Sequence, residues 1–173
     1  MMRVGSGLDV HAFAPGIPLW LGGIHIPHPR GLAGHSDGDA VVHALIDALL
    51  GAAGMGDIGR MFADTDPRWK DADSLHLLNQ AYLTIVEDGF QFVQADITVI
   101  AERPKLAPYV ERMQEKLANA LIAPASAVSV KAKTNEGMGF IGRGEGIAVI
   151  AVATLNQPDA PRLSGGLAGA DLL

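Results

Sequence analysis

The chain has 173 residues, of which 49% are hydrophobic and only 18% charged. An average soluble domain has roughly 25% charged residues, so this chain is expected to fold around one packed core. Thirteen Lys and Arg stand against nineteen Asp and Glu, a net charge of −6, which argues against affinity for nucleic acid through many phosphate contacts. Because there is no cysteine, disulfide scaffolds, thiol nucleophiles, iron–sulfur clusters and thiolate zinc sites are excluded, and a metal would have to be bound by His and carboxylate side chains.

Targeting, membrane and nucleotide-loop signals are not found. Residues 1–7 have no basic segment followed by a long apolar one, so no secretory signal is expected. The apolar stretches 40–55, interrupted by His43 and Asp47, and 147–155 are unsuited to crossing a bilayer. Neither common nucleotide fingerprint has a convincing match. The sequence therefore predicts a cytoplasmic protein with neither membrane nor nucleic acid as a partner.

The first elements predicted are a strand and a hairpin. Residues 2–13 alternate between small, apolar and polar side chains, as a strand does. The apolar side chains that we expect on its buried face are Val4, Leu8, Val10 and Ala12. Residues 19–21 and 24–26 flank a Gly-Gly pair, which is typical of a hairpin. Residues 27–34 are expected to form a loop.

A helix and a polar segment follow. Asp37 or Asp39 can cap a helix with apolar residues at helical spacing through Leu50, and Gly54 and Gly56 end it. Residues 58–71 are polar, contain a proline and are expected to form a mobile loop.

The second half predicts two more helices and three strands. Ser74 opens a helix that Gly89 ends, and Pro108 lies in the first turn of a third helix reaching residue 122. Residues 92–101, 128–132 and 146–155 indicate strands, the last two joined by a glycine-rich connection. This mixture predicts an α/β or α+β fold with one sheet, in a single domain over residues 1–156 with a flexible tail over 157–173.

Asp9 and His11 lie two residues apart on the first predicted strand, so both side chains leave the same face. Alone, such a pair equally describes a solvated face. His43, in the first turns of the following helix, adds a third donor, and three His and carboxylate ligands are typical of a zinc site with an open fourth position. Asp47 lies one turn beyond His43 and is either an orienting partner of its imidazole or a helix-surface acid.

Two further segments could bind anionic or polyol groups. His35 and Ser36 precede the helix, where free N–H groups favour a phosphate; the alternative is a capping turn that occupies the same N–H groups. Asp57, Asp64 and Asp66 could bind polyol hydroxyls or be simply solvated.

Residues 131–146 are the least ordinary stretch of the chain. Alternating glycines from Gly137 to Gly146 let the backbone approach a ligand or another subunit closely. Thr134 offers a hydroxyl, Glu136 an oxygen ligand suited to magnesium, and Arg143 a forked cation. The alternative is a bulged β-hairpin, which explains the glycines but not the charged residues. The histidines outside these segments, His25, His28 and His76, are expected to be structural.

Three motifs taken together resemble the 2-C-methyl-D-erythritol 2,4-cyclodiphosphate synthase family. They are G-x-G-L-D-V-H-A-F at residues 5–13, H-S-D-G-D-A-V-V-H-A-L-I-D-A-L-L-G-A at 35–52, and T-N-E-G-M-G-F-I-G-R-G-E-G-I-A at 134–148. The resemblance runs in order over most of residues 2–155, including G-D-I-G-x-x-F-x-D-T-D-P at 56–67 and A-x-x-P-K at 101–105. The tail after Leu155 lies outside it.

The resemblance implies a metal-dependent phosphorus–oxygen lyase of non-mevalonate isoprenoid biosynthesis. It implies a homotrimer whose sheets face a central axis, with helices outside and active sites at subunit boundaries. The implied substrate is 4-diphosphocytidyl-2-C-methyl-D-erythritol 2-phosphate, whose 2-phosphate attacks the β-phosphorus, expels CMP and closes a cyclic diphosphate. In phosphoryl transfer the protein mainly positions groups and neutralises charge, so no protein nucleophile is needed. A central channel near Phe140 and Arg143 could hold an isoprenoid diphosphate.

Carried over by motif, the resemblance assigns zinc to Asp9, His11 and His43, and magnesium or manganese to Glu136. His35 and Thr134 would stabilise the transition state. The implied substrate-binding residues are Asp9, Val10, His11, His35, Ser36, Asp57, Ile58, Gly59, Phe62, Ala63, Asp64, Thr65, Asp66, Ala101, Glu102, Arg103, Pro104, Lys105, Leu106, Ala107, Ala132, Lys133, Thr134, Asn135, Glu136, Phe140 and Arg143.

The chain differs from the family pattern at Lys133, Asn135 and Ile141, where the pattern often has threonine. Two other functions stay open. One is a zinc-dependent phosphohydrolase, in which a metal-bound water is the nucleophile. The other is a non-enzymatic sensor that binds a nucleotide or an isoprenoid diphosphate without turnover.

Overall fold

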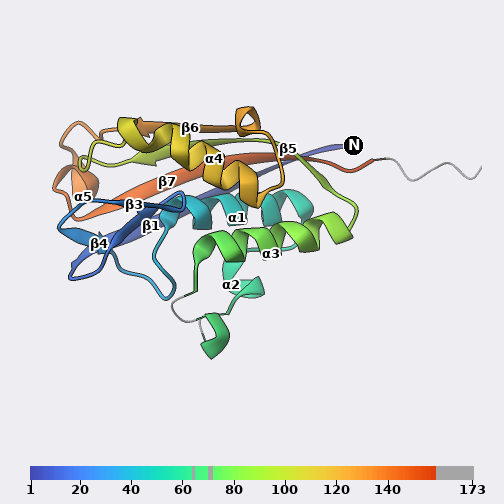
Figure 1. The fold of residues 1–173 in the computed structure, drawn as a ribbon, viewed down its shortest axis with the longest axis horizontal. Helices are drawn as coiled ribbons and strands as arrows, with labels where there is room; N and C mark the ends of the chain where they lie inside the picture. Colours follow the sequence, from blue (N-terminus) through green and yellow to red (C-terminus); the bar gives the residue numbers. More distant parts are fainter. Residues whose placement is uncertain (64, 70–71, 159–173) are drawn as a thin grey trace, which may run out of the picture.

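The computed structural model of the chain describes residues 1–63, 65–69 and 72–158 and contains two β-sheets with helices (Figure 1). Its strands are β1 Met2–Pro15, β2 Leu19–Leu21, β3 Ile24–Ile26, β4 Arg30–Leu32, β5 Gln91–Ile100, β6 Val128–Lys133 and β7 Gly146–Asn156. Its α-helices are α1 Ala40–Ala53, α2 Ile58–Met61, α3 Ser74–Glu87, α4 Val110–Ala120 and α5 Gly139–Gly142. Short 3₁₀ helices are η1 Pro67–Trp69, η2 Ala107–Tyr109 and η3 Ala125–Ala127. Asp64 and residues 159–173 of the expected tail lie outside the described residues.

The main sheet has five strands in the order β4-β1-β7-β5-β6. All neighbouring pairs are antiparallel except β5 and β6, which are parallel and are connected through α4. The remaining strands, β2 and β3, form the expected hairpin. These findings confirm the predicted mixed fold with a sheet packed by helices. In the described part of the chain, no helix has the length and apolar character needed to span a membrane.

The helices α1, α3 and α4 lie on one side of the sheet (Figure 1). The core beneath them combines α1 residues such as Leu45 and Leu49 with Ile97 of β5 and Val149 of β7, all fully buried. Strand side chains alternate between the two faces of a sheet, and no helix of the described residues covers the opposite face. The residues that it presents to solvent in the single chain include Met2, Val4, Leu8, Val10, Ile150 and Val152.

The prediction that Val4, Leu8, Val10 and Ala12 line a buried face of β1 is therefore wrong for the single chain, in which all four are exposed. The side of β1 that packs on α1 is occupied by Gly5, Gly7, Asp9 and His11 instead. A Cβ at Gly5 would lie 2.1 Å from the Ala48 carbonyl oxygen, so the two backbones approach too closely for larger side chains. The alternation of apolar residues correctly predicted a strand, but the face of that strand that packs against α1 is the one that carries the glycines.

Two segments predicted as loops contain regular structure. Residues 30–32 form β4, a three-residue edge strand that pairs with the end of β1. Within 58–71, α2 and η1 are helical, and the carboxylate of Asp57 caps α2 by accepting from the Arg60 N–H at 2.8 Å. Elements of three or four residues bury little apolar surface, so they leave almost no periodic pattern in the sequence.

The glycine-rich segment does not form a β-hairpin. β5 lies between β6 and β7, so the two strands on either side of the segment are not neighbours. The segment instead contains the short helix α5, and its Gly142 packs against Gly137 so closely that a Cβ would come within 2.0 Å of the Gly137 carbonyl carbon.

Candidate metal centre and ligand cavity

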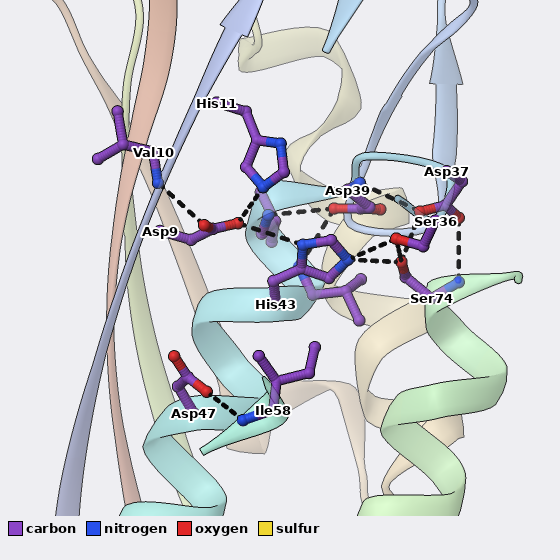
Figure 2. A network of polar contacts seen from close by, with 12 residues as sticks. Asp9, Val10, His11, Ser36, Asp37, Asp39, His43, Asp47, Ile58 and Ser74 are labelled. Carbon is purple, nitrogen blue, oxygen red and sulfur yellow. Dashed lines mark hydrogen bonds and ion pairs between the residues drawn. The ribbon is translucent and has the colours of Figure 1, made fainter. Parts of the chain in front are cut away.

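Asp9, His11 and His43 converge where the middle of β1 meets the start of α1 (Figure 2). Asp9 and His11 leave β1 on the side that faces α1, and His43 lies in the first turn of α1. Asp9 Oδ2 lies 2.9 Å from His11 Nε2 and 3.2 Å from His43 Nδ1. The structure thus brings together the three residues whose spacing predicted a metal site.

The electrostatics of this cluster favour a negatively charged Asp9. Burial alone would raise the pKa of the Asp9 carboxyl, but close contact with the imidazoles of His11 and His43 outweighs it and holds this pKa well below its usual range. The contact with Asp9 raises the pKa of His11, although burial of the ring opposes this shift. A cation is therefore favoured beside Asp9, whether a proton on imidazole or a metal ion.

The outer nitrogen of each imidazole has a hydrogen-bond partner. His11 Nδ1 lies 2.5 Å from the carbonyl oxygen of Ala33, and since a carbonyl only accepts, this nitrogen must carry the hydrogen. His43 Nε2 contacts the hydroxyls of Ser36 at 3.0 Å and Ser74 at 2.9 Å. A neutral His11 with its hydrogen on Nδ1 presents the Nε2 lone pair toward Asp9.

The donor set fits a zinc ion. Two imidazole nitrogens and one carboxylate oxygen are ordinary zinc ligands, and three protein ligands leave a position for substrate. Asp9 Oδ2 is buried, yet no well-aligned hydrogen bond from the described residues reaches it. A buried carboxylate oxygen of this kind is expected to be neutralised by a cation.

A cavity of about 210 Å³ opens beside the cluster. Besides the three residues of the cluster, it is lined by His35, Ser36, Asp47, Ile58, Gly59, Phe62, Trp69 and Leu77. The lining thus combines polar groups with apolar side chains, and of the latter Phe62 packs edge-on against Trp69 at a ring-centroid distance of 5.0 Å. The cavity can accept a molecule with an anionic part beside the metal ligands and a less polar part along the rings.

Asp47 is not placed as an orienting partner of His43. Its Oδ1 atom accepts a hydrogen bond from the Ile58 N–H at 2.8 Å, which ties the start of α2 to α1 (Figure 2). Burial raises the pKa of Asp47, and this hydrogen bond partly offsets the effect. The spacing of one helical turn correctly placed Asp47 near His43 in the cavity lining, but the Asp47 carboxylate binds the N–H of Ile58 in the segment after α1.

The first N–H groups of α1 are already occupied by a side chain. Asp39 caps the helix, and its Oδ1 accepts from Val41 and Val42 at 3.1 Å each. The same carboxylate accepts from Gly22 and Gly23 of the β2–β3 turn, and its burial raises the pKa of Asp39. These contacts fit the capping alternative for the helix start: they occupy the two N–H groups and do not involve His35 or Ser36.

The residues of the acidic segment, 57–66, have different roles: one caps a helix, and others line the cavity. Asp57 caps α2, and Ile58, Gly59 and Phe62 line the cavity. Asp66 forms an ion pair with Arg68 at 2.6 Å. The described neighbours Ala63 and Thr65 are exposed, and Asp64 lies outside the described residues.

Two segments of the implied substrate-binding set, residues 101–107 and 132–136, lie next to each other at the ends of β5 and β6. Ala101 donates its N–H to the Lys133 carbonyl at 2.9 Å. Glu102 Oε1 accepts from the N–H groups of Asn135 and Gly137 at 3.0 Å each, which fixes the turn after β6. Thr134 donates its hydroxyl to Glu136 Oε1 at 2.7 Å.

Within one chain these segments are not joined to the metal cluster. The strand register aligns Val10, Ala148, Ile100 and Lys133 across β1, β7, β5 and β6. Three strand spacings of about 4.8 Å separate β1 from β6, roughly 14 Å in all. Thr134 and Glu136 are therefore at the same end of the sheet as Asp9 but distant from it, and they are absent from the cavity lining.

Phe140 and Arg143 lie on and just after α5. Phe140 is 41% exposed, and Arg143 forms an ion pair with Glu145 at 2.6 Å. Val10 is also partly exposed, with its side chain on the helix-free face of β1.

Sequence reasoning missed Trp69, Leu77 and Ser74. Trp69 and Leu77 complete the apolar wall of the cavity, and Ser74 holds the imidazole of His43. The sequence around Ser74 indicates only the start of a helix, because nothing in it shows that α3 begins beside α1.

This architecture defines a class: an α/β protein with a candidate His and carboxylate metal centre beside a ligand cavity. The chain belongs to the YgbB family, whose model matches residues 2–156.

Individual relatives agree with this assignment. A 2-C-methyl-D-erythritol 2,4-cyclodiphosphate synthase from Geobacillus thermodenitrificans is 52% identical over 160 residues, covering 92% of this chain and 100% of that protein. The solved bifunctional IspDF from Campylobacter jejuni has a TM-score of 0.88 at 45% identity, covering 92% of this chain and 43% of that chain. A CDP-bound 2C-methyl-D-erythritol-2,4-cyclodiphosphate synthase has a TM-score of 0.82 at 39% identity, covering 89% of this chain and 100% of that one.

Proposed function

We propose that this chain converts 4-diphosphocytidyl-2-C-methyl-D-erythritol 2-phosphate to 2-C-methyl-D-erythritol 2,4-cyclodiphosphate and CMP. The names of its relatives support this reaction. The observation that carries it is the Asp9, His11 and His43 cluster, which lines one cavity together with His35 and Ser36. The 2-phosphate oxygen would attack the β-phosphorus, and the bond from that phosphorus to the oxygen of CMP would break.

The metal requirement follows from charge. A zinc ion held by Asp9, His11 and His43, with a magnesium or manganese ion held by Glu136, would supply positive charge to the substrate phosphates. The chain has a net charge of −6, so its own side chains do not supply a surplus of positive charge to balance the phosphates.

The protein's own groups would bind and orient the reacting phosphates. His35 and Ser36 lie in the cavity lining beside the cluster, where they can donate hydrogen bonds to phosphate oxygens. The Thr134 hydroxyl, which rests on Glu136 in this structure, can turn to a phosphate once Glu136 binds its cation. The acidic segment from Asp57 to Asp66 would bind the erythritol hydroxyls.

The nucleotide would be bound by residues 101–107 and 132–136. Their mutual hydrogen bonds through Glu102 preform a backbone turn, and a structural relative is described as binding CDP. Glu102 already satisfies two N–H groups of this turn, so the cytidine would be met mainly by the other backbone groups of these segments.

A homotrimer would complete the site. The nucleotide segments end β5 and β6 at one edge of the sheet, and β1, which carries Asp9 and His11, is three strands away from β6. The face of the sheet without helices exposes Val4 at 66% and Leu8 at 63%. Apolar surface of this kind is expected to be covered by a partner. Packing three such faces around an axis would bury it and bring Thr134 and Glu136 of one subunit to the metal cluster of the next. A central channel between the sheets, with Phe140 and Arg143 near its end, could then hold an isoprenoid diphosphate.

We assign this activity to residues 1–156, with 157–173 as a tail outside the catalytic domain, and we place it in the cytoplasm because the substrate is a nucleotide conjugate carrying several phosphate charges.

The test is a single-turnover assay with the cytidine diphosphate substrate, zinc and magnesium in ¹⁸O-water. We expect equimolar CMP and cyclic diphosphate, both without ¹⁸O. A linear product carrying solvent oxygen would replace this proposal with a phosphohydrolase, and tight binding without turnover would replace it with a sensor. His25→Ala, which changes an exposed histidine of the β2–β3 hairpin, serves as the control and should keep the activity.

A further inference from the structure

Three side chains from different segments form a polar chain behind the candidate metal centre. Asp37 lies in the segment before α1, Ser74 is the first residue of α3, and His43 belongs to α1 (Figure 2). Ser74 is fully buried. Neither Asp37 nor Ser74 belongs to the proposed ligand or substrate sets, yet both lie within one or two hydrogen bonds of His43.

The direction of each hydrogen bond in this chain follows from the donors available. The Ser74 hydroxyl lies 2.5 Å from Asp37 Oδ1, and the Ser74 N–H donates to Asp37 Oδ2 at 3.0 Å. A carboxylate only accepts, so the single hydroxyl hydrogen of Ser74 is given to Asp37. Ser74 Oγ can then act toward His43 only as an acceptor.

The acceptor role of Ser74 decides which nitrogen of His43 bears hydrogen. His43 Nε2 lies 2.9 Å from Ser74 Oγ, so Nε2 must donate, and a neutral imidazole then has its lone pair on Nδ1. Nδ1 is the atom that faces Asp9 Oδ2 at 3.2 Å. Ser36 Oγ, 3.0 Å from the same Nε2, can take part only as a second acceptor.

We propose that Asp37 and Ser74 are positioning residues that hold His43 in the tautomer whose Nδ1 is free to bind the metal. This inference rests on the proposed metal centre and extends it to two residues that touch neither metal nor substrate. It also gives a reason for the contact between α1 and α3, since the start of α3 carries the acceptor that orients a ligand on α1. Partners of this kind typically change metal affinity by about 10- to 100-fold.

Ser74→Ala is the main variant. The N-cap of α3 is Asp73, which accepts from the Leu75 N–H at 2.9 Å, so the helix start is retained. Ser36→Ala is the matched control, because it removes a hydroxyl at nearly the same distance from the same nitrogen but leaves the Asp37 to Ser74 chain intact.

Asp37→Asn tests the direction of the chain without changing its shape. Asp37 Oδ1 accepts from the Asp39 N–H and the Ser74 hydroxyl, while Oδ2 accepts from the Ser74 N–H. An asparagine amide can replace only one of these two oxygens. Either it faces an N–H with its own NH₂, or it donates to Ser74 and turns the serine hydrogen toward His43 Nε2, which favours the wrong tautomer.

The experiment measures zinc affinity of the full chain by competition with a fluorescent chelator. In the same samples, the ring N–H of His43 is followed by ¹H–¹⁵N correlation of zinc-loaded, ¹⁵N-histidine protein. We expect Ser74→Ala and Asp37→Asn to lose about 10- to 100-fold in zinc affinity and to lose the protected Nε2–H signal by exchange with water. Ser36→Ala should lose less affinity and keep the signal.

Parental affinity and a protected Nε2–H signal in Ser74→Ala would overturn the inference, as would a greater loss in Ser36→Ala. If Ser74→Ala fails to fold by circular dichroism, Asp37→Asn decides in the same way. Failure of the unchanged protein to bind zinc would instead overturn the metal centre itself, so the two failures are distinguishable.

Discussion

Gly7 of β1 lies directly against the carbonyl oxygen of Ala44 in α1, so closely that a Cβ on Gly7 would come within 2.0 Å of that oxygen. Asp9 is two residues beyond Gly7 on the same face, and His43 directly precedes Ala44. The close approach of the two backbones therefore brings a strand ligand and a helix ligand of the candidate metal centre to within 3.2 Å. Packing and site geometry depend on the same contact.

Gly7→Ala should consequently damage both stability and metal binding. The added methyl group forces α1 away from β1, and overpacking of this kind costs about 1–3 kcal/mol or more. We expect a lower Tm at fixed protein concentration and a weaker zinc affinity, measured by thermal unfolding and chelator competition. Gly51→Ala is the control: within α1 its Cβ would meet only the Ser6 carbonyl oxygen at 3.9 Å, so helix propensity should stabilise it by up to about 1 kcal/mol. Equal Tm values for the two variants would contradict this account.

From the sequence, the helices and strands could be predicted more reliably than which face of each one is buried. Helix α1 could be predicted from its apolar spacing, its capping aspartate and Gly54, because each of these is a local feature. The buried face of β1 could not, because the alternation of Val4, Leu8 and Val10 indicates a strand but does not show which side α1 approaches. That choice depends on Gly5 and Gly7 meeting a helix some forty residues later.

The metal cluster could be predicted because two of its members share a strand face and the third follows at a helix start. Ser74 and Asp47 show the limit of such reasoning. Ser74 reaches His43 only through the packing of α3 on α1, and Asp47 is taken up by the N–H of Ile58. Contacts between segments far apart in the sequence determine both roles, and residue spacing cannot predict such contacts.

His43→Ala should abolish zinc retention while leaving the fold largely intact. The imidazole supplies one of three ligand atoms, and an alanine at this helical position costs little because alanine favours helices. Metal content by mass spectrometry after gel filtration, with circular dichroism as the fold check, measures both effects. His25→Ala removes an exposed histidine whose ring lies tilted against Trp20, outside the site, and the variant should keep its zinc. Full zinc occupancy in His43→Ala would rule out the ligand assignment.

The stability of the metal-free protein should depend on pH through Asp47. Burial raises the folded-state pKa of this carboxyl above its unfolded value of about 3.9. The folded state then binds the proton more strongly, so the Asp47 contribution is most favourable below the unfolded pKa and is lost as pH rises through the folded pKa.

Asp47→Asn should remove this loss, because the neutral amide can keep its oxygen on the Ile58 N–H without burying a charge. Urea unfolding of both proteins with EDTA, at one protein concentration between pH 4 and pH 8, measures the difference. We expect the advantage of the variant to be greatest near neutral pH and to shrink toward pH 4. A difference that stays constant with pH would show that Asp47 does not titrate as described.

The proposed trimer predicts that one charge on the helix-free face is enough to separate the subunits. Leu8 is 63% exposed in the single chain, and its side chain leaves β1 opposite Gly7. In the assembled trimer Leu8→Asp would bury an unpaired carboxylate, which is strongly unfavourable. Ile122→Asp is the matched control, because Ile122 is 74% exposed after α4 and has a positive φ of 53°, which aspartate tolerates better than isoleucine.

Light scattering after gel filtration should give a trimer mass for the parent and for Ile122→Asp, and a monomer mass for Leu8→Asp. Activity should fall together with the trimer, since Thr134 and Glu136 of one subunit would no longer meet Asp9 and His43 of another. A monomeric Leu8→Asp protein with full activity would show that one chain contains the whole site, in conflict with the roughly 14 Å of sheet that separates the two halves.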